Sequence, residues 1–87
     1  MKAVITVIGK DMVGIIAKVS AIVADANANI LEITQSVLQD YFAMIMLVDL
    51  SAMNCDLDEL RATLQEQMEG MQITVMHEDV FESMHHV

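Results

Sequence analysis

The chain has 87 residues, which is enough for one small domain around a single core and leaves nothing for a second domain. Hydrophobic residues make up 55% of it and the mean hydropathy is +0.49, so a monomer of this size has more apolar surface than it can bury and part of that surface is expected to meet another chain. The formal charge of −9, with only four lysines and arginines, would repel phosphate groups, which excludes nucleic acid and anionic membranes as partners.

Residues 2–8 predict a first strand, because β-branched side chains are frequent in this segment and Gly9 ends it. The segment is also too short for a signal-peptide core and lacks a small-residue cleavage site. The longest apolar run, residues 41–48, is well below the roughly 20 residues that a membrane-spanning helix needs. We therefore expect a soluble, cytoplasmic protein.

A helix is predicted after the loop 9–14 and ends near Asn27. Its apolar residues recur at the spacing of one helical face, at Ile15, Val19, Ile22 and Ala26.

Two β-type segments follow, residues 30–38 and 41–50, and the two residues Gln39 and Asp40 between them suit a tight hairpin. The second segment is apolar on both faces, with Tyr41, Ala43, Ile45 and Leu47 on one and Phe42, Met44, Met46 and Val48 on the other. It should therefore be a central strand. The first segment alternates between Leu31, Ile33 and Val37 on one face and Glu32, Thr34 and Ser36 on the other, which is typical of an edge strand with one wet face.

The second half of the chain predicts another helix and strand. Asp56 and Glu59 form a capping-box pattern, and the helix that follows ends at Gly70. Its apolar stripe consists of Leu57, Leu60, Leu64 and Met68. Alternation over residues 71–75 predicts a fourth strand, and Asp79 with Glu82 repeats the capping pattern before a short terminal helix.

The predicted order is βαββαβ with a helical tail, a single domain over residues 1–87. Right-handed crossovers place the two main helices on one face of a four-stranded antiparallel sheet. This is the α+β, ferredoxin-like sandwich, and because unrelated functions share that fold, the fold alone names none of them.

The loop 9–14 is the most informative segment for function, because it leads from a central strand directly into a helix. Unpaired backbone N–H groups at a helix start can accept a carboxylate, and Gly14 would let a ligand approach the backbone. Asp11 offers a counter-charge for an ammonium group, so the loop suits the two poles of an amino acid. The alternative, with equal weight on residue types alone, is that Gly14 only opens the helix and Asp11 only caps it.

Catalytic and metal chemistry have little support. No histidine follows a known local pattern with serine or cysteine, so we expect no catalytic residues and no enzyme activity. Cys55 is the only cysteine, which excludes an internal disulfide, and its polar neighbours Asn54 and Asp56 suggest an exposed loop thiol.

The histidines near the carboxyl end invite a zinc or nickel hypothesis. His77 and Asp79 could share a face of the fourth strand, but with His85 and His86 they match no compact ligand motif. Late in a helix, His85 and His86 also favour its dipole without any metal. We expect no metal site and no cofactor.

The chain resembles the ACT domains along nearly its whole length. The motifs that carry the resemblance are ITVIGKDMVGIIAKVS at residues 5–20, NILEITQS at 29–36, YFAM at 41–44 and VFESMH at 80–85. They are similar to the small stand-alone ACT proteins of bacteria and archaea. The opening is also similar to the amino-terminal domains of formyltetrahydrofolate deformylases and to glycine-cleavage repressor proteins.

The resemblance implies a regulatory homodimer that binds a small effector, an amino acid or a similar molecule, near the subunit interface. Asp11, Met12, Val13, Gly14 and Ile15 would form the ligand loop, and the partner subunit would contribute Asn29, Ile30 and Leu31. The chain departs from its stand-alone relatives at His86, where they often carry a basic residue.

Such a module is expected to act on a partner, an enzyme or a regulator. The competing hypothesis is a protein–protein interaction module that modulates a metabolic enzyme or regulator without any ligand.

Overall fold

The computed structural model describes residues 1–10 and 14–84, with Leu38 described through its backbone only. In chain order the elements are β1 (Lys2–Gly9), α1 (Ile15–Asp25), β2 (Asn29–Leu38), β3 (Tyr41–Asp49), α2 (Leu57–Gln67), β4 (Gln72–His77) and α3 (Glu78–Met84). This confirms the predicted α+β, ferredoxin-like fold and its terminal helix. None of the helices in the described part combines the length and apolarity required to cross a membrane.

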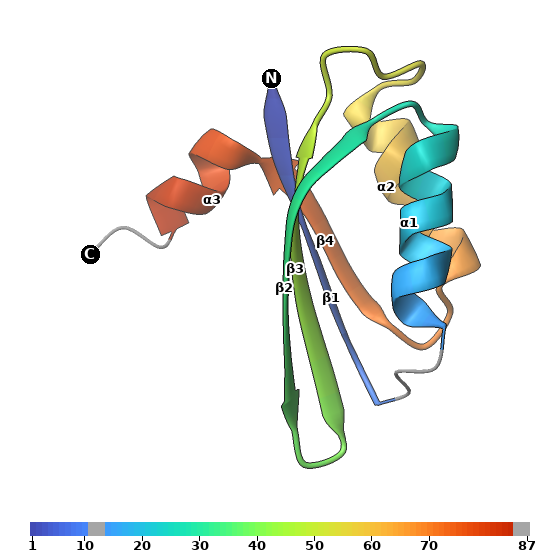
Figure 1. Cartoon of the computed structure of the whole chain (residues 1–87), viewed down its shortest axis with the longest axis vertical. Coiled ribbons are helices and arrows are strands. Elements are labelled where there is room, and N and C mark those ends of the chain that lie inside the picture. The colour runs from blue at the N-terminus through green and yellow to red at the C-terminus, as the bar shows by residue number, and fades with distance from the viewer. Residues whose placement is uncertain (11–13, 85–87) are drawn as a thin grey trace.

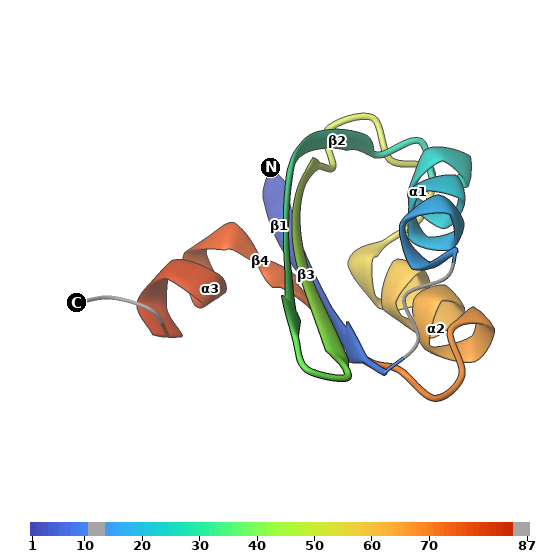
Figure 2. The same ribbon diagram turned by 60° about the horizontal axis from the view of Figure 1, so that its bottom comes forward.

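The four strands form one antiparallel sheet in the order β2-β3-β1-β4. The prediction that β3 is central and β2 an edge strand is confirmed. Helices α1 and α2 lie on one face of the sheet, and α3 lies on the other side (Figures 1 and 2). The face toward α1 and α2 is called the covered face below, and the opposite face is called the open face.

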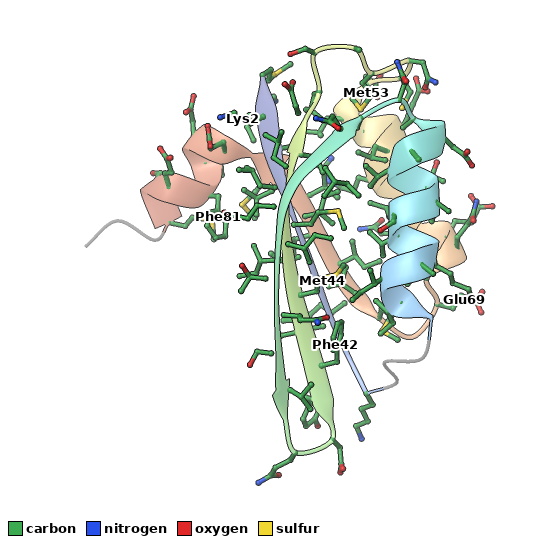
Figure 3. The ribbon with its side chains drawn as sticks, viewed as in Figure 1. Lys2, Phe42, Met44, Met53, Glu69 and Phe81 are labelled. Carbon is green, nitrogen blue, oxygen red and sulfur yellow. The ribbon has the colours of Figure 1, made fainter. Side chains whose placement is uncertain are left out.

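The hydrophobic core lies between the covered face and the two main helices. The register pairs Ile5 with Met46 and Val7 with Met44, and all four side chains are fully buried. The labelled side chains of Phe42 and Met44 point from the sheet toward α1 (Figure 3). The helices complete the core with their predicted apolar stripes, chiefly Ile15, Val19 and Ile22 from α1 and Leu60 and Leu64 from α2. Helix α1 also buries Val23, which the predicted stripe did not include.

Helix α2 begins as predicted but ends earlier. The Asp56 carboxylate caps it by accepting a hydrogen bond from the Glu59 backbone N–H at 2.8 Å. The helix stops at Gln67, because the backbone of Met68 already leaves helical geometry. Gly70, expected as the helix end, lies instead in the following turn with φ +82°.

The end of β4 also differs from the prediction. Its pairing with β1 continues to His77, which lies opposite Ala3, and α3 begins at the next residue, Glu78. Asp79 is therefore inside the first turn of α3, and it neither caps that helix nor shares a strand face with His77.

The pattern of β2 is interrupted by a bulge between Ile30 and Glu32. Because directly paired residues point to the same side of a sheet, the register places Ile30 opposite Val48, on the covered face together with Ile33. Leu31 is the extra residue, so its predicted place in the same row as Ile33 and Val37 is wrong. The side chains of residues 31–37 are all exposed.

Candidate functional site

The predicted ligand loop lies where β1 leads into α1. Asp11, Met12 and Val13 fall outside the described residues. Gly14 is the N-cap of α1 and Ile15 is its first residue, so the prediction that this loop opens directly into a helix is confirmed.

Gly14 owes its place to its backbone conformation. Its φ is +74°, in the left-handed region that side chains with a Cβ rarely adopt. A Cβ built on it would meet nothing within 4 Å, so the residue is not crowded and its backbone is accessible. The requirement for glycine here is therefore conformational.

The first turn of α1 lacks the usual neutralising groups. Gly14 has no side chain to cap the helix, and the first turn carries no acidic residue. The first intrahelical hydrogen bond runs from the Lys18 N–H to the Gly14 carbonyl at 2.9 Å. The N–H groups that precede it have no helical acceptor and point out of the helix start, which is the geometry that favours a carboxylate.

Ile15 contributes differently from Gly14. Its side chain is buried in the core between α1 and the sheet. Its side chain therefore fixes the position of the helix start and is not exposed at the surface.

The second predicted group, residues 29–31, lies at the opposite end of α1. Asn29 opens β2 and pairs with Asp49, Ile30 packs against the core, and Leu31 is exposed at the bulge. Helix α1 has 11 residues, a length of roughly 16 Å at 1.5 Å per residue. One chain therefore does not bring Asn29 and Gly14 together.

A depression beside the start of α1 was not foreseen from the sequence. Its volume is about 300 Å³, and Ile15 and Lys18 line it together with residues 66–69 and Met71. A second depression of about 490 Å³ lies between the end of β1 and residues 69–72. Pairing of Ile8 with Gln72 brings these segments together, and no local pattern reveals that contact.

Gly9 is required in this region for a different reason from Gly14. A Cβ on Gly9 would collide with the sulfur of Met71. Met71 thus lies directly over the end of β1, and the loop that follows α2 helps to shape the surface near Gly14.

Comparison with known proteins decides the family. The model of the ACT domain matches residues 2–78. The chain belongs to the ACT domain family. A UPF0237 protein from Methanopyrus kandleri is 50% identical over 88 residues, an alignment that covers 99% of this chain and 98% of that protein.

Solved structures agree with this ACT assignment. An ACT domain protein from Streptococcus pneumoniae matches with a TM-score of 0.79 and 39% identity, over 94% of each chain. The formyltetrahydrofolate deformylase of Pseudomonas putida shares the fold, with a TM-score of 0.77 and 17% identity over 91% of this chain and 29% of that one. A glycine cleavage system repressor structure matches with a TM-score of 0.71 and 26% identity, over 85% and 43% of the two chains. The predicted resemblances are confirmed.

The thiol of this ACT domain is less accessible than expected. Cys55 is half-buried and packs against the core, so the prediction of an exposed loop thiol is wrong. Burial raises the pKa of Cys55, and the nearby carboxylates of Glu59 and Asp56 raise it further. The thiol is therefore protonated and weakly nucleophilic near neutral pH.

Metal ligands do not gather in the described part of the ACT domain: within residues 1–10 and 14–84, no three His, Cys, Asp or Glu side chains come close enough to hold an ion. His77 is exposed at the end of β4. His85 and His86 lie outside the described residues.

Proposed function

We propose that this ACT domain is a non-catalytic sensor that binds a small effector, an amino acid or a similar molecule, as a homodimer. ACT domains are regulatory ligand-binding modules, and the family match covers most of the chain. The effector would control an enzyme or regulator through its preference for one arrangement of the dimer.

The observation that carries this proposal is the accessible backbone at Gly14. A left-handed glycine with open space around it leads into a helix whose first turn has no acidic residue. A ligand carboxylate would accept hydrogen bonds from the N–H groups of that turn and would be favoured by the helix dipole. Asp11, which by resemblance to the family belongs to the ligand loop, would offer a counter-charge to the ligand ammonium.

The separation of the two predicted residue groups supports a dimeric site. A second copy can be placed beside the β2 edge by a two-fold axis perpendicular to the sheet. In that arrangement the β2 strands of the two copies run in opposite directions. The Asn29 end of that copy would then come near the Gly14 end of the first. Strand β2 forms the sheet edge and carries the exposed apolar side chains of Ile33 and Val37, which suits such an edge-to-edge contact.

Thermal unfolding of the purified protein against the twenty amino acids and common metabolites tests this proposal. A ligand at 100 times its dissociation constant stabilises the folded state by about 2.7 kcal/mol. In a domain of this size, that corresponds to a rise in Tm of roughly 10 °C or more. We expect such a rise with one chemical class.

Two glycines provide a matched pair of variants. Gly14→Ala and Gly70→Ala both place a Cβ at a positive φ, +74° and +82°, and both Cβ atoms enter open space. Each should therefore lose about 1–2 kcal/mol of stability from backbone strain. Only Gly14→Ala should also abolish the ligand-dependent rise in Tm.

One result would count against the sensor, and two would count against the site at Gly14. If no compound raises Tm, the ligand-independent interaction module becomes the better hypothesis. If Gly14→Ala keeps the full rise, the ligand binds elsewhere. If Gly70→Ala abolishes the rise and Gly14→Ala keeps it, the effector lies in the depression beside Gly70 instead of at the start of α1.

A further inference from the structure

The open face of the sheet is covered at one end and bare at the other. Val4, which lies opposite Leu47 and Met76, is only 4% exposed. Farther along the same face, Ile8 and Ile45 are each 43% exposed and Tyr41 is 51% exposed. Ile8, Ile45 and Tyr41 are called the bare patch below.

Helix α3 accounts for this gradient, because it contacts β1 and β4 next to the Val4 end. It then leads away from the sheet (Figures 1 and 2). Within its own chain, α3 therefore leaves the bare patch uncovered.

The helix is itself incompletely packed. None of its residues is buried, Val80 is 49% exposed and Met84 is 65% exposed. Phe81, on the side nearer the sheet (Figure 3), is half-buried. A helix of seven residues is too short to be stable by its own hydrogen bonds, so it needs an apolar surface to pack against.

The bare patch and α3 match in length. Tyr41 and Ile45 are four residues apart on β3, which is about 13 Å at 3.3 Å per residue. The seven residues of α3 span roughly 10 Å. One α3 therefore fits the length of the bare patch along β3.

Their charges are also complementary. Helix α3 carries Glu78, Asp79 and Glu82 and no basic residue. The cation of Lys10 lies at the bare end of the open face, with its Nζ 5.6 Å from the centre of the Tyr41 ring. An acidic, apolar helix placed on the bare patch would meet this ammonium group.

We propose that the open face binds a second copy of this chain, with α3 of each copy lying across the bare patch of the other. The contact is two-fold and isologous, because the same chain supplies both the helix and the patch. It buries Val80 and Met84 against Ile8, Ile45 and Tyr41, with the acidic side chains of α3 near Lys10. The contact goes beyond the proposed function, because it needs no ligand and leaves both Gly14 and the β2 edge free.

Disulfide trapping between two differently tagged chains tests this contact directly. Both chains carry Cys55→Ser, which removes the only cysteine; one then carries Val80→Cys and the other Ile45→Cys. After mixing and oxidation, we expect a mixed cross-linked dimer. Val37→Cys, at a more exposed position but on the covered face of β2, replaces Ile45→Cys in the control and should give at least tenfold less mixed dimer.

Two trapping results would overturn the proposal. One is equal cross-linking with Val37→Cys and Ile45→Cys, which would indicate random collision. The other comes from a single chain that carries both Val80→Cys and Ile45→Cys: if it closes an internal disulfide at high dilution and forms no dimer, α3 folds over its own sheet.

Sedimentation of the uncross-linked protein gives an independent measurement. Ile45→Asp and Met84→Asp should each weaken association through the open face at least tenfold, and Lys10→Gln should weaken it less. These side chains are exposed, so Tm measured under dissociating dilution should change by no more than a few degrees. Unchanged association in both aspartate variants would overturn the proposal.

The two self-association surfaces can be separated in the same experiment. Val37→Asp removes apolar surface at the β2 edge and should leave the open-face dimer intact. If no compound raises Tm while Ile45→Asp still weakens association, the sensor proposal alone is wrong. If a compound raises Tm while Ile45→Asp leaves association unchanged, the open-face contact alone is wrong.

Discussion

The two faces of β3 have nearly the same composition and opposite environments. On the covered face, Phe42, Met44, Met46 and Val48 are all buried; on the open face, Tyr41 and Ile45 are exposed and Ala43 and Leu47 are half-buried. Right-handed crossovers bring α1 and α2 to the same side of the sheet, so only one of two apolar rows receives a cover. Apolar composition predicts that a strand is central, but the position of the helices decides which side chains are buried.

The largest expected effect comes from neighbouring residues on the two faces. Met46→Ala should lower the free energy of unfolding by about 2–5 kcal/mol, because it leaves a cavity in the core. Ile45→Ala should lower it by less than about 1 kcal/mol, because that side chain is half in water. Urea unfolding of both variants, at a protein concentration low enough to prevent association, measures the difference.

Similar losses in the two variants would break this comparison. They would mean that the open face is as well packed in the single chain as the covered face.

An intermediate effect on stability is expected at Arg61, which connects α2 to the sheet through a hydrogen bond. The Arg61 guanidinium donates to the Val75 carbonyl and to the Asp58 carboxylate, each at 2.5 Å, and thereby ties α2 to β4. Arg61→Ala should cost about 1–2 kcal/mol, because the half-buried carbonyl loses its charged donor.

Asp58→Ala is the matched control, because it removes the ion pair of Arg61 and keeps the hydrogen bond to Val75. Asp58 is 88% exposed, and exposed ion pairs contribute little. The control should therefore cost less than about 0.5 kcal/mol in the same urea measurement. A control as damaging as Arg61→Ala would show that the ion pair, and not the bond to β4, matters.

The smallest effect on stability is expected at Asp49, the polar residue at the end of β3 on the open face. The Asp49 carboxylate accepts hydrogen bonds from the Ser51 hydroxyl at 2.6 Å and from the Ser51 N–H at 2.9 Å, and these bonds lower the pKa of Asp49. A carboxyl group whose pKa is lower in the folded state stabilises the fold above its unfolded pKa, and this contribution is lost as the pH falls through the folded pKa.

Ser51→Ala removes the hydrogen bond from the Ser51 hydroxyl, which is the larger of the two causes that lower the pKa of Asp49. The pKa of Asp49 should rise toward its ordinary value in an NMR titration. The variant should be less stable than the parent at pH 7, and the difference should disappear at low pH where Asp49 is protonated in both. A difference that persists at low pH would indicate a role of Ser51 unrelated to this carboxylate.

The sequence predicted most of the fold because its elements have strong local patterns. The apolar stripe of α1, the Asp56 cap and the two-residue connection between β2 and β3 each depend on neighbouring residues, and each is confirmed. Errors occurred where pairing with a distant strand competes with a local pattern. Strand β4 continues to His77 because β1 offers it a partner, and the β2 bulge displaces Leu31 from the row that simple alternation assigned to it.

The candidate site was predicted less completely for the same reason. The type and position of Gly14 indicated a ligand-accessible helix start, and the structure supplies the left-handed backbone that makes glycine necessary there. The contact of Met71 with Gly9 and the half-burial of Cys55 depend on segments far apart in the chain. No spacing within the sequence encodes such contacts.

By itself, the sequence determined the order of the elements, the central place of β3 and the membership of a regulatory family, because periodicity, capping and motif are local properties. Only the tertiary structure decided which apolar row of β3 is buried and where α3 stands. It also placed Gly14 and Asn29 at opposite ends of one chain. The physical reason is that burial and proximity arise when separate elements pack together, and packing depends on the directions in which the chain crosses the sheet.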